Sequence, residues 1–136
     1  MKKIIIIILC VILTSCTTVY RTGDQSFMMY DKEENEYYTV EHLSDQVDTI
    51  IIEKDLIQIL IVGQDPIIMD VTYHSNITSE RDGEVVNAKL YDGLVDGKEC
   101  RVVVVKDKNY IGYYHTYNPD INFYSYLVVF RILKKC

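Results

Sequence analysis

The feature that most constrains the fold of this chain is a recurring alternation of apolar and polar residues with a period of two. Side chains of a β-strand point alternately to opposite faces, so each such run predicts a strand with one buried face. The runs recur about every ten residues and are separated by turn residues, which is typical of antiparallel sandwiches and barrels. We expect strands at 37–41, 47–53, 56–62, 67–74, 86–90, 100–105, 110–115 and 121–133.

These runs predict an all-β domain, a small antiparallel meander barrel or sandwich of about seven to nine strands. The segment 75–83 is polar and is expected to be a loop, and Asp92-Gly93 and Asp96-Gly97 are turn dipeptides. A short helix is the one exception that the pattern allows. It would place Val40, Leu43 and Val47 on one face.

The N-terminus has the layout of an export signal. Lys2 and Lys3 precede an apolar run, Ile4 to Leu13, after which the chain turns polar. A membrane-spanning helix needs about twenty apolar residues, so this run is too short to span. We therefore expect it to be cleaved after export.

The residues that follow resemble the lipobox of bacterial lipoproteins. An aliphatic residue, Leu13, is followed by two small residues and then by Cys16. The resemblance implies that the Cys16 sulfur receives a diacylglyceryl group and that the chain is cut just before it. The resemblance covers about sixteen residues, so it implies a processing route and no activity. In Gram-negative lipoproteins an Asp after the lipidated cysteine favours the inner membrane; Thr17 stands there instead, which favours the outer membrane. The alternative is an ordinary secretory signal that is cut near an unrelated cysteine.

We expect three regions: a signal peptide at 1–15, a lipidated N-terminus and tether at 16–35, and an antiparallel β domain at 36–136. The formal net charge is −6, and loss of Lys2 and Lys3 makes it −8. Such a charge argues against nucleic acid, which is bound through cationic neutralisation of phosphates. A basic protein partner fits it better, although an acidic surface can simply keep a domain soluble.

Two cysteines remain once Cys16 is acylated, and in an oxidising compartment Cys100 and Cys136 predict a disulfide. Two free thiols, or an intermolecular bond through Cys136, are the alternatives. The histidines His42, His74 and His115 show no metal-ligand spacing, so we predict no metal and no cofactor. Asp70 is expected on the polar face of its strand.

Tyrosine crowds the segment 110–117, around Gly112. Tyrosine rings are common both in cores and at binding surfaces. In a regular strand Tyr110 and Tyr114 share one face with Gly112, whereas Ile111 and Tyr113 take the other. We expect Ile111 and Tyr113 to be core, and Tyr110, Gly112 and Tyr114 to form a binding surface, because glycine would let a ligand or another backbone approach.

No motif of nucleophilic or acid–base catalysis is present, so we predict no catalytic residues and no enzymatic activity. The expected function is that of a membrane-anchored binding or structural module of the bacterial envelope. Its partner would be another envelope protein or a small ligand. The alternative is an acidic inhibitor of a basic hydrolase such as lysozyme.

Overall fold

The computed structural model of this protein describes residues 17–44 and 46–135. This described part contains nine strands and one 3-10 turn, η1 (Lys106–Lys108). The strands are β1 (Thr18–Asp31), β2 (Glu36–Leu43), β3 (Asp48–Ile52), β4 (Leu56–Leu60), β5 (Ile67–Arg81), β6 (Glu84–Val95), β7 (Lys98–Val105), β8 (Tyr110–Asn118) and β9 (Phe123–Lys135).

The strands form a closed barrel. From β3 to β9 each strand pairs antiparallel with the next in sequence, and β1 pairs with both β3 and β9. Eight strands therefore close the barrel, and β2 is added to it as a ninth. The prediction of a small antiparallel barrel is confirmed.

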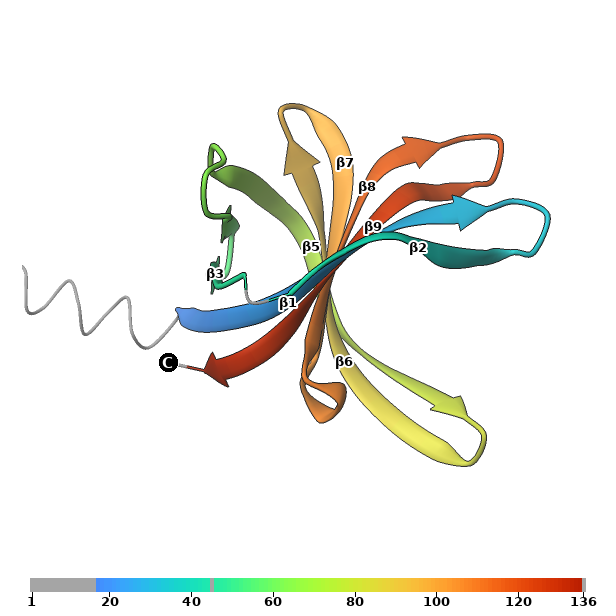
Figure 1. The fold of residues 1–136 in the computed structure, drawn as a ribbon, viewed down its shortest axis with the longest axis horizontal. Helices are drawn as coiled ribbons and strands as arrows, with labels where there is room; N and C mark the ends of the chain where they lie inside the picture. The colour runs from blue at the N-terminus through green and yellow to red at the C-terminus, as the bar shows by residue number, and fades with distance from the viewer. Residues whose placement is uncertain (1–16, 45, 136) are drawn as a thin grey trace, which may run out of the picture.

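Strand β1 serves two partners along one edge. Thr18 to Thr22 pair with β3, whereas Gln25 to Asp31 pair with β2. The β1–β2 hairpin consequently leaves the barrel wall and projects beside the β8–β9 hairpin (Figure 1). The two hairpins extend the wall beyond the barrel as a curled ribbon.

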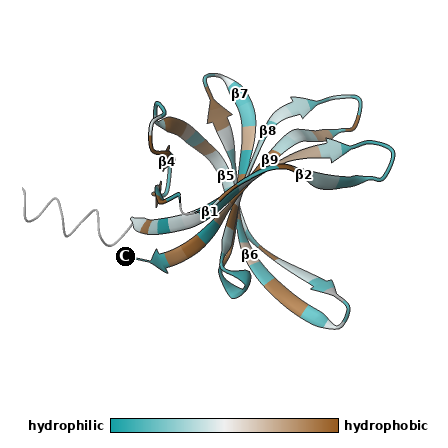
Figure 2. Ribbon diagram, viewed as in Figure 1, coloured by the Kyte–Doolittle hydropathy of each residue, from teal (hydrophilic) through white to brown (hydrophobic). Residues whose placement is uncertain are grey.

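The barrel is filled by side chains. Apolar and polar residues alternate along most strands (Figure 2), and the apolar set points inward. The innermost residues include Ile50, Ile57, Ile59, Met69, Val102, Ile111 and Phe130, each fully buried. Ile111 and Tyr113 belong to this core, as the alternation predicts. Asp70 is exposed, as expected.

Because the strands alternate in direction, the connections gather at two rims. The near rim holds the start of β1, the β3–β4 turn, η1 and the end of β9. The far rim holds the β1–β2, β4–β5, β6–β7 and β8–β9 connections. The long β5–β6 hairpin also leaves from the near side, but its tip projects away from the end of β9 (Figure 1).

Several local predictions are wrong. The segment 16–35, expected as a tether, contains strand β1, which begins at Thr18. The strand expected at 37–41 is confirmed as β2, so the short helix that the pattern allowed around Val40 is not formed there. β1 forms a strand because it finds partners on both sides, which a local pattern does not reveal. The predicted signal peptide and Cys16 lie outside the described residues. Among the described residues no helix is long and apolar enough to cross a membrane.

The predicted loop at 75–83 is also wrong, since β5 continues to Arg81 and pairs with β6 throughout. Asp92-Gly93 is not a turn but lies inside β6. A Cβ on Gly93 would stand 2.1 Å from the Asp70 carbonyl oxygen, so the glycine allows a close approach at a β-bulge. The Asp96-Gly97 turn is confirmed, with positive φ at both residues.

Candidate functional site

An aromatic cluster lies where the two projecting hairpins curl together. It contains Tyr30 and Tyr37 of the β1–β2 hairpin and Tyr114, Tyr117, Phe123 and Tyr124 of the β8–β9 hairpin. The Tyr37 ring meets the Tyr114 ring edge-on at 5.8 Å, although β1 and β9 lie between their strands in the sheet order. The outer face of the ribbon is therefore concave here.

Hydrogen bonding fixes this curl. The Tyr37 hydroxyl donates to the Tyr124 carbonyl oxygen at 2.6 Å, across 87 residues of sequence. Burial, followed by the neighbouring rings of Tyr114 and Tyr30, raises the pKa of Tyr37. Tyr37 thus stays protonated and remains a donor at physiological pH.

Arg101 of β7 brings a positive charge to the cluster. Its guanidinium lies 5.8 Å from the ring centres of both Phe123 and Tyr124. It also donates to both carboxylate oxygens of Asp92, at 2.7 and 3.3 Å. The bond to Asp92 raises the pKa of Arg101 further. Aromatic faces and a bidentate carboxylate hold the guanidinium in one orientation.

A pocket of about 510 Å³ opens beside this arginine. The strands β5, β6 and β7 form its floor, and the β8–β9 hairpin forms its wall. Its lining includes Asp92, Glu99, Arg101, Tyr117, Asn122, Phe123 and Tyr124. Charged groups of both signs, amide and hydroxyl groups, the exposed Tyr117 ring and the half-buried Phe123 ring can together hold a ligand with an apolar face and polar edges. We call this the arginine pocket.

The three residues predicted as a binding surface do not act alike. Tyr114 is half-buried and stacks on Phe123 at 5.6 Å, so it supports the wall of the arginine pocket. Gly112 is buried: a Cβ there would stand 3.1 Å from Leu127 and 3.4 Å from the Tyr114 ring. The glycine therefore accommodates the protein's own side chains and offers no approach to a ligand. Tyr110 is 36% exposed and lies at the opposite end of β8.

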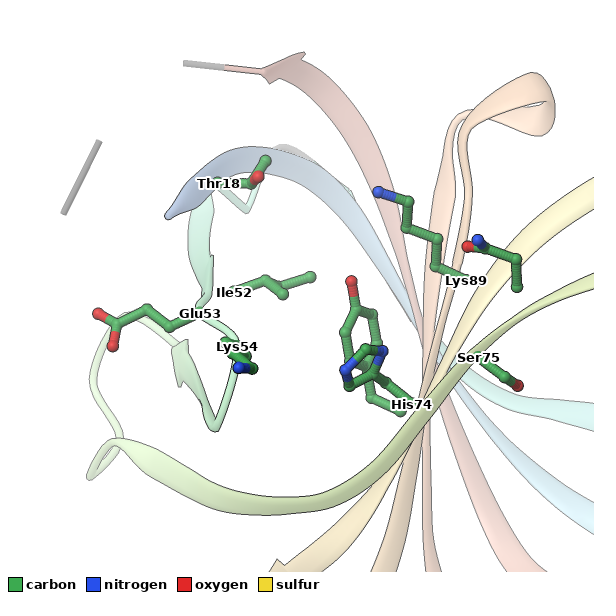
Figure 3. A pocket seen from close by; sticks show the side chains of 9 residues that line it. Thr18, Ile52, Glu53, Lys54, His74, Ser75 and Lys89 are labelled. Carbon is green, nitrogen blue, oxygen red and sulfur yellow. The ribbon is translucent and has the colours of Figure 1, made fainter. Parts of the chain in front are cut away.

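A second pocket, of about 310 Å³, is the mouth of the barrel at the near rim (Figure 3). His74 and Tyr91 lie ring against ring at 6.3 Å, and Ile52 points toward them. Alternation alone places His74 outside the barrel. The β-bulge between Val71 and Tyr73 reverses the pattern, which exposes Tyr73 and turns His74 into the mouth.

The strand register argues against the predicted disulfide. Cys100 is a free, buried thiol beside the Tyr113 hydroxyl at 3.7 Å. In the strand register, the neighbouring residue Arg101 pairs with Tyr114, which pairs in turn with Leu127 of β9. Lys135, the residue before Cys136, lies eight residues beyond Leu127 along β9. Eight strand residues span about 26 Å, whereas bridged cysteines have Cα atoms within about 7 Å. Cys136 itself lies outside the described residues.

His42, His74 and His115 lie on three separate strands. Within residues 17–44 and 46–135, no group of three or more His, Cys, Asp or Glu side chains could hold a metal ion. His42 contacts Ser26, and His115 stacks between Tyr113 and Tyr126. Burial lowers the pKa of His115.

Charge is distributed unevenly between the rims. The far rim carries two lysines, Lys32 and Lys98, and many carboxylates: Asp31, Glu33, Glu34, Glu36, Asp65, Asp96, Glu99 and Asp120. The near rim carries more cations than anions: Lys54, Lys89, Lys106, Lys108, Lys134 and Lys135 stand beside Glu53, Asp55, Glu84 and Asp107. The hairpin topology, which spacing along the chain does not reveal, separates the charges in this way.

No protein-family model matches this chain, and no curated protein or solved structure matches it. The fold and the pockets therefore carry the functional argument.

Proposed function

We propose that this protein is a lipid-anchored lipoprotein of the bacterial cell envelope, preferentially of the outer membrane, and that it acts by binding and not by catalysis. The arginine pocket is the observation that carries this proposal. It lies toward the far rim, away from the chain end that would bear the lipid. A partner could therefore reach it while the barrel stays on the membrane.

The pocket favours a ligand or protein segment that offers an apolar face and hydrogen-bonding groups. The exposed Tyr117 and the half-buried Phe123 provide ring surface, and Arg101, held by Asp92 against Phe123 and Tyr124, provides an oriented donor. Aromatic and arginine side chains dominate the energy of many interfaces, and here the ion pair with Asp92 already orders Arg101 before a ligand arrives. An envelope protein or a small ligand of the envelope fits this description.

Substitution of Arg101 tests the pocket. We expect Arg101→Gln to lower recovery of cross-linked partners from solubilised membranes at least tenfold. Arg131→Gln is the matched control, because Arg131 also pairs with an aspartate, Asp24, but lies outside the pocket. Melting temperatures of both variants separate lost binding from lost folding. Equal recovery with the two variants would refute the pocket as the binding site.

The anchor is tested separately. Cys16→Ser should leave the precursor uncut and abolish detergent-phase partitioning, because acyl transfer needs the thiol and lipoprotein cleavage needs the acyl group. Normal cleavage of the mutant together with detergent partitioning would contradict the lipoprotein assignment.

The acidic far rim favours a second function, inhibition of a basic hydrolase. Glu33, Glu34 and Glu36 project on the β1–β2 hairpin, where they would meet the basic surface of such an enzyme first. Inhibition of a basic lysozyme at low salt, weakened by Glu33→Gln/Glu34→Gln, is the expected result. Full lysozyme activity in excess protein would exclude this function.

A further inference from the structure

Four lysines crowd one side of the near rim. Lys134 and Lys135 end β9, and Lys106 begins η1. A backbone hydrogen bond from Ile132 to the Asn109 carbonyl ties these two segments together at 2.8 Å. Lys106, Lys134 and Lys135 line one groove, and Lys89 shares a neighbouring groove with Lys106. We call these four residues the lysine rim.

The lysines are close enough to repel one another. Partial burial, and then the positive charges of Lys135 and Lys89, lower the pKa of Lys106. Among the described residues no salt bridge neutralises any of the four; Lys108, beyond them, pairs with Glu84. Arg21, opposite Lys134 in the β1–β9 pairing, adds another cation to this side. In a chain of net charge −6, such a concentration of cations is complementary to an external anionic surface.

Two carboxylates lie near the lysine rim, and one of them, Asp107, lines the groove of Lys89 and Lys106. Glu53, in the β3–β4 turn, directs its carboxylate away from Lys89 and the mouth (Figure 3). Asp107 lies within reach of the Asn87 backbone N–H at 3.5 Å. The lysine rim also has an exposed apolar neighbour, Leu133, which is 51% exposed. Amphipathic helices that bind membranes combine lysines with apolar side chains that enter the headgroup boundary, and the lysine rim offers both kinds of side chain.

We propose that the lysine rim docks on anionic phospholipid headgroups, so that the barrel rests on its membrane by charge as well as by lipid. The orientation rests on the proposed lipid anchor. β1 begins at Thr18, and two residues of chain span at most about 7 Å, so lipid on Cys16 would hold the near rim at the bilayer surface. The charge attraction is independent of the anchor and can be measured without it.

The first experiment uses residues 17–136 without lipid, since the barrel closes entirely within Thr18–Lys135. Flotation with phosphatidylcholine vesicles, with and without phosphatidylglycerol, measures binding. We expect binding to the anionic vesicles only, weakening as salt rises. Each lysine near an anionic surface contributes about a fivefold factor, so Lys106→Gln/Lys135→Gln should bind about 25-fold more weakly.

The matched control is Lys32→Gln/Lys98→Gln, which removes the same charge from the far rim. Its binding should stay within about twofold of the wild type. An equal loss in both double variants would overturn the proposal, because only net charge would then matter. Binding of inorganic phosphate without binding of anionic vesicles would also overturn it. Neither result depends on Cys16, so failure of the lipid anchor remains distinguishable.

The second experiment tests orientation in the full lipidated protein. Amine acetylation of Lys106, Lys134 and Lys135 should slow at least fivefold in anionic vesicles compared with detergent micelles. Lys32 and Lys98 should react at the same rate in both. Equal protection of the two rims would overturn the proposed orientation.

Discussion

At the scale of the single residue, Tyr110 and Tyr114 should differ in how much each side chain contributes to stability. Tyr110→Ala should change the free energy of unfolding by within about 0.5 kcal/mol, as exposed truncations do. Tyr114→Ala should cost about 2 to 3 kcal/mol, because it removes the ring that stacks on Phe123 and covers Gly112. Denaturant unfolding of each variant measures this. Equal costs would contradict the structural role given to Tyr114.

Part of this difference could be predicted from the sequence. Alternation correctly separates Ile111 and Tyr113 from Tyr110, Gly112 and Tyr114. It cannot reveal that the β1–β2 hairpin brings Tyr37 onto Tyr114, because that contact joins segments about eighty residues apart. Arg101 was missed for the same reason, since its aromatic partners lie on another hairpin. The only local signal was a charged residue at the start of an apolar strand.

Cys100 should behave as an inert thiol. Burial raises its pKa, an effect that the hydrogen bond with Tyr113 only partly offsets. The thiolate is the reactive form, so Cys100 should resist iodoacetamide at neutral pH in the folded protein and react fully in denaturant. Mass spectrometry without reductant gives the result. A Cys100–Cys136 bridge in the folded monomer would contradict the register of β7 and β9.

His115 gives stability a pH dependence. Burial lowers its pKa below the ordinary 6.5. Between the lowered pKa of the folded protein and the ordinary pKa of the unfolded chain, the unfolded chain binds more protons than the folded protein does. The free energy of unfolding therefore rises with pH through this window. The free energy of unfolding should therefore fall as pH drops below about 6.5. His115→Gln should flatten this part of the profile, and an unchanged profile would show that other groups cause it.

At the scale of the element, Asp48, the first residue of β3, links this strand to the segment that follows β4 and to the residues just before β3. This buried carboxylate accepts from the Val62 backbone N–H at 3.1 Å and from the Gln46 amide at 3.3 Å. Asp48→Ala removes the acceptor and should cost about 1 to 3 kcal/mol in denaturant unfolding. Asp48→Asn, which keeps one acceptor oxygen, is the control and should recover part of the loss.

Which elements could be predicted depended on where their partners lie. Strands β4, β7 and β8 pair with near neighbours and are rich in β-branched or aromatic residues, and the sequence predicts them close to their observed bounds. Strand β1 and the outer half of β5 are polar, and they can be recognised as strands only once the strands that pair with them are known. The bulge at Val71 is equally invisible in sequence, and it alone decides which side His74 faces.

For the whole molecule, sequence favoured a barrel and a sandwich equally. The pairing of β1 with β9 decides between them, and it joins the two ends of the chain. The concentration of lysines at the near rim and of carboxylates at the far rim follows from the same topology. This distribution could not be predicted because the lysines of η1 and of β9 are separated by most of two strands.

The β1–β9 pairing also has a consequence for how the protein is made. During synthesis β1 must wait, with one long edge unpaired, until β9, about a hundred residues later in the chain, has followed. Contacts between residues so distant in sequence slow folding, because the intervening loop must be closed first. We therefore expect a late folding step in which β9 closes onto β1, and a need to shield the open edge of β1 until then.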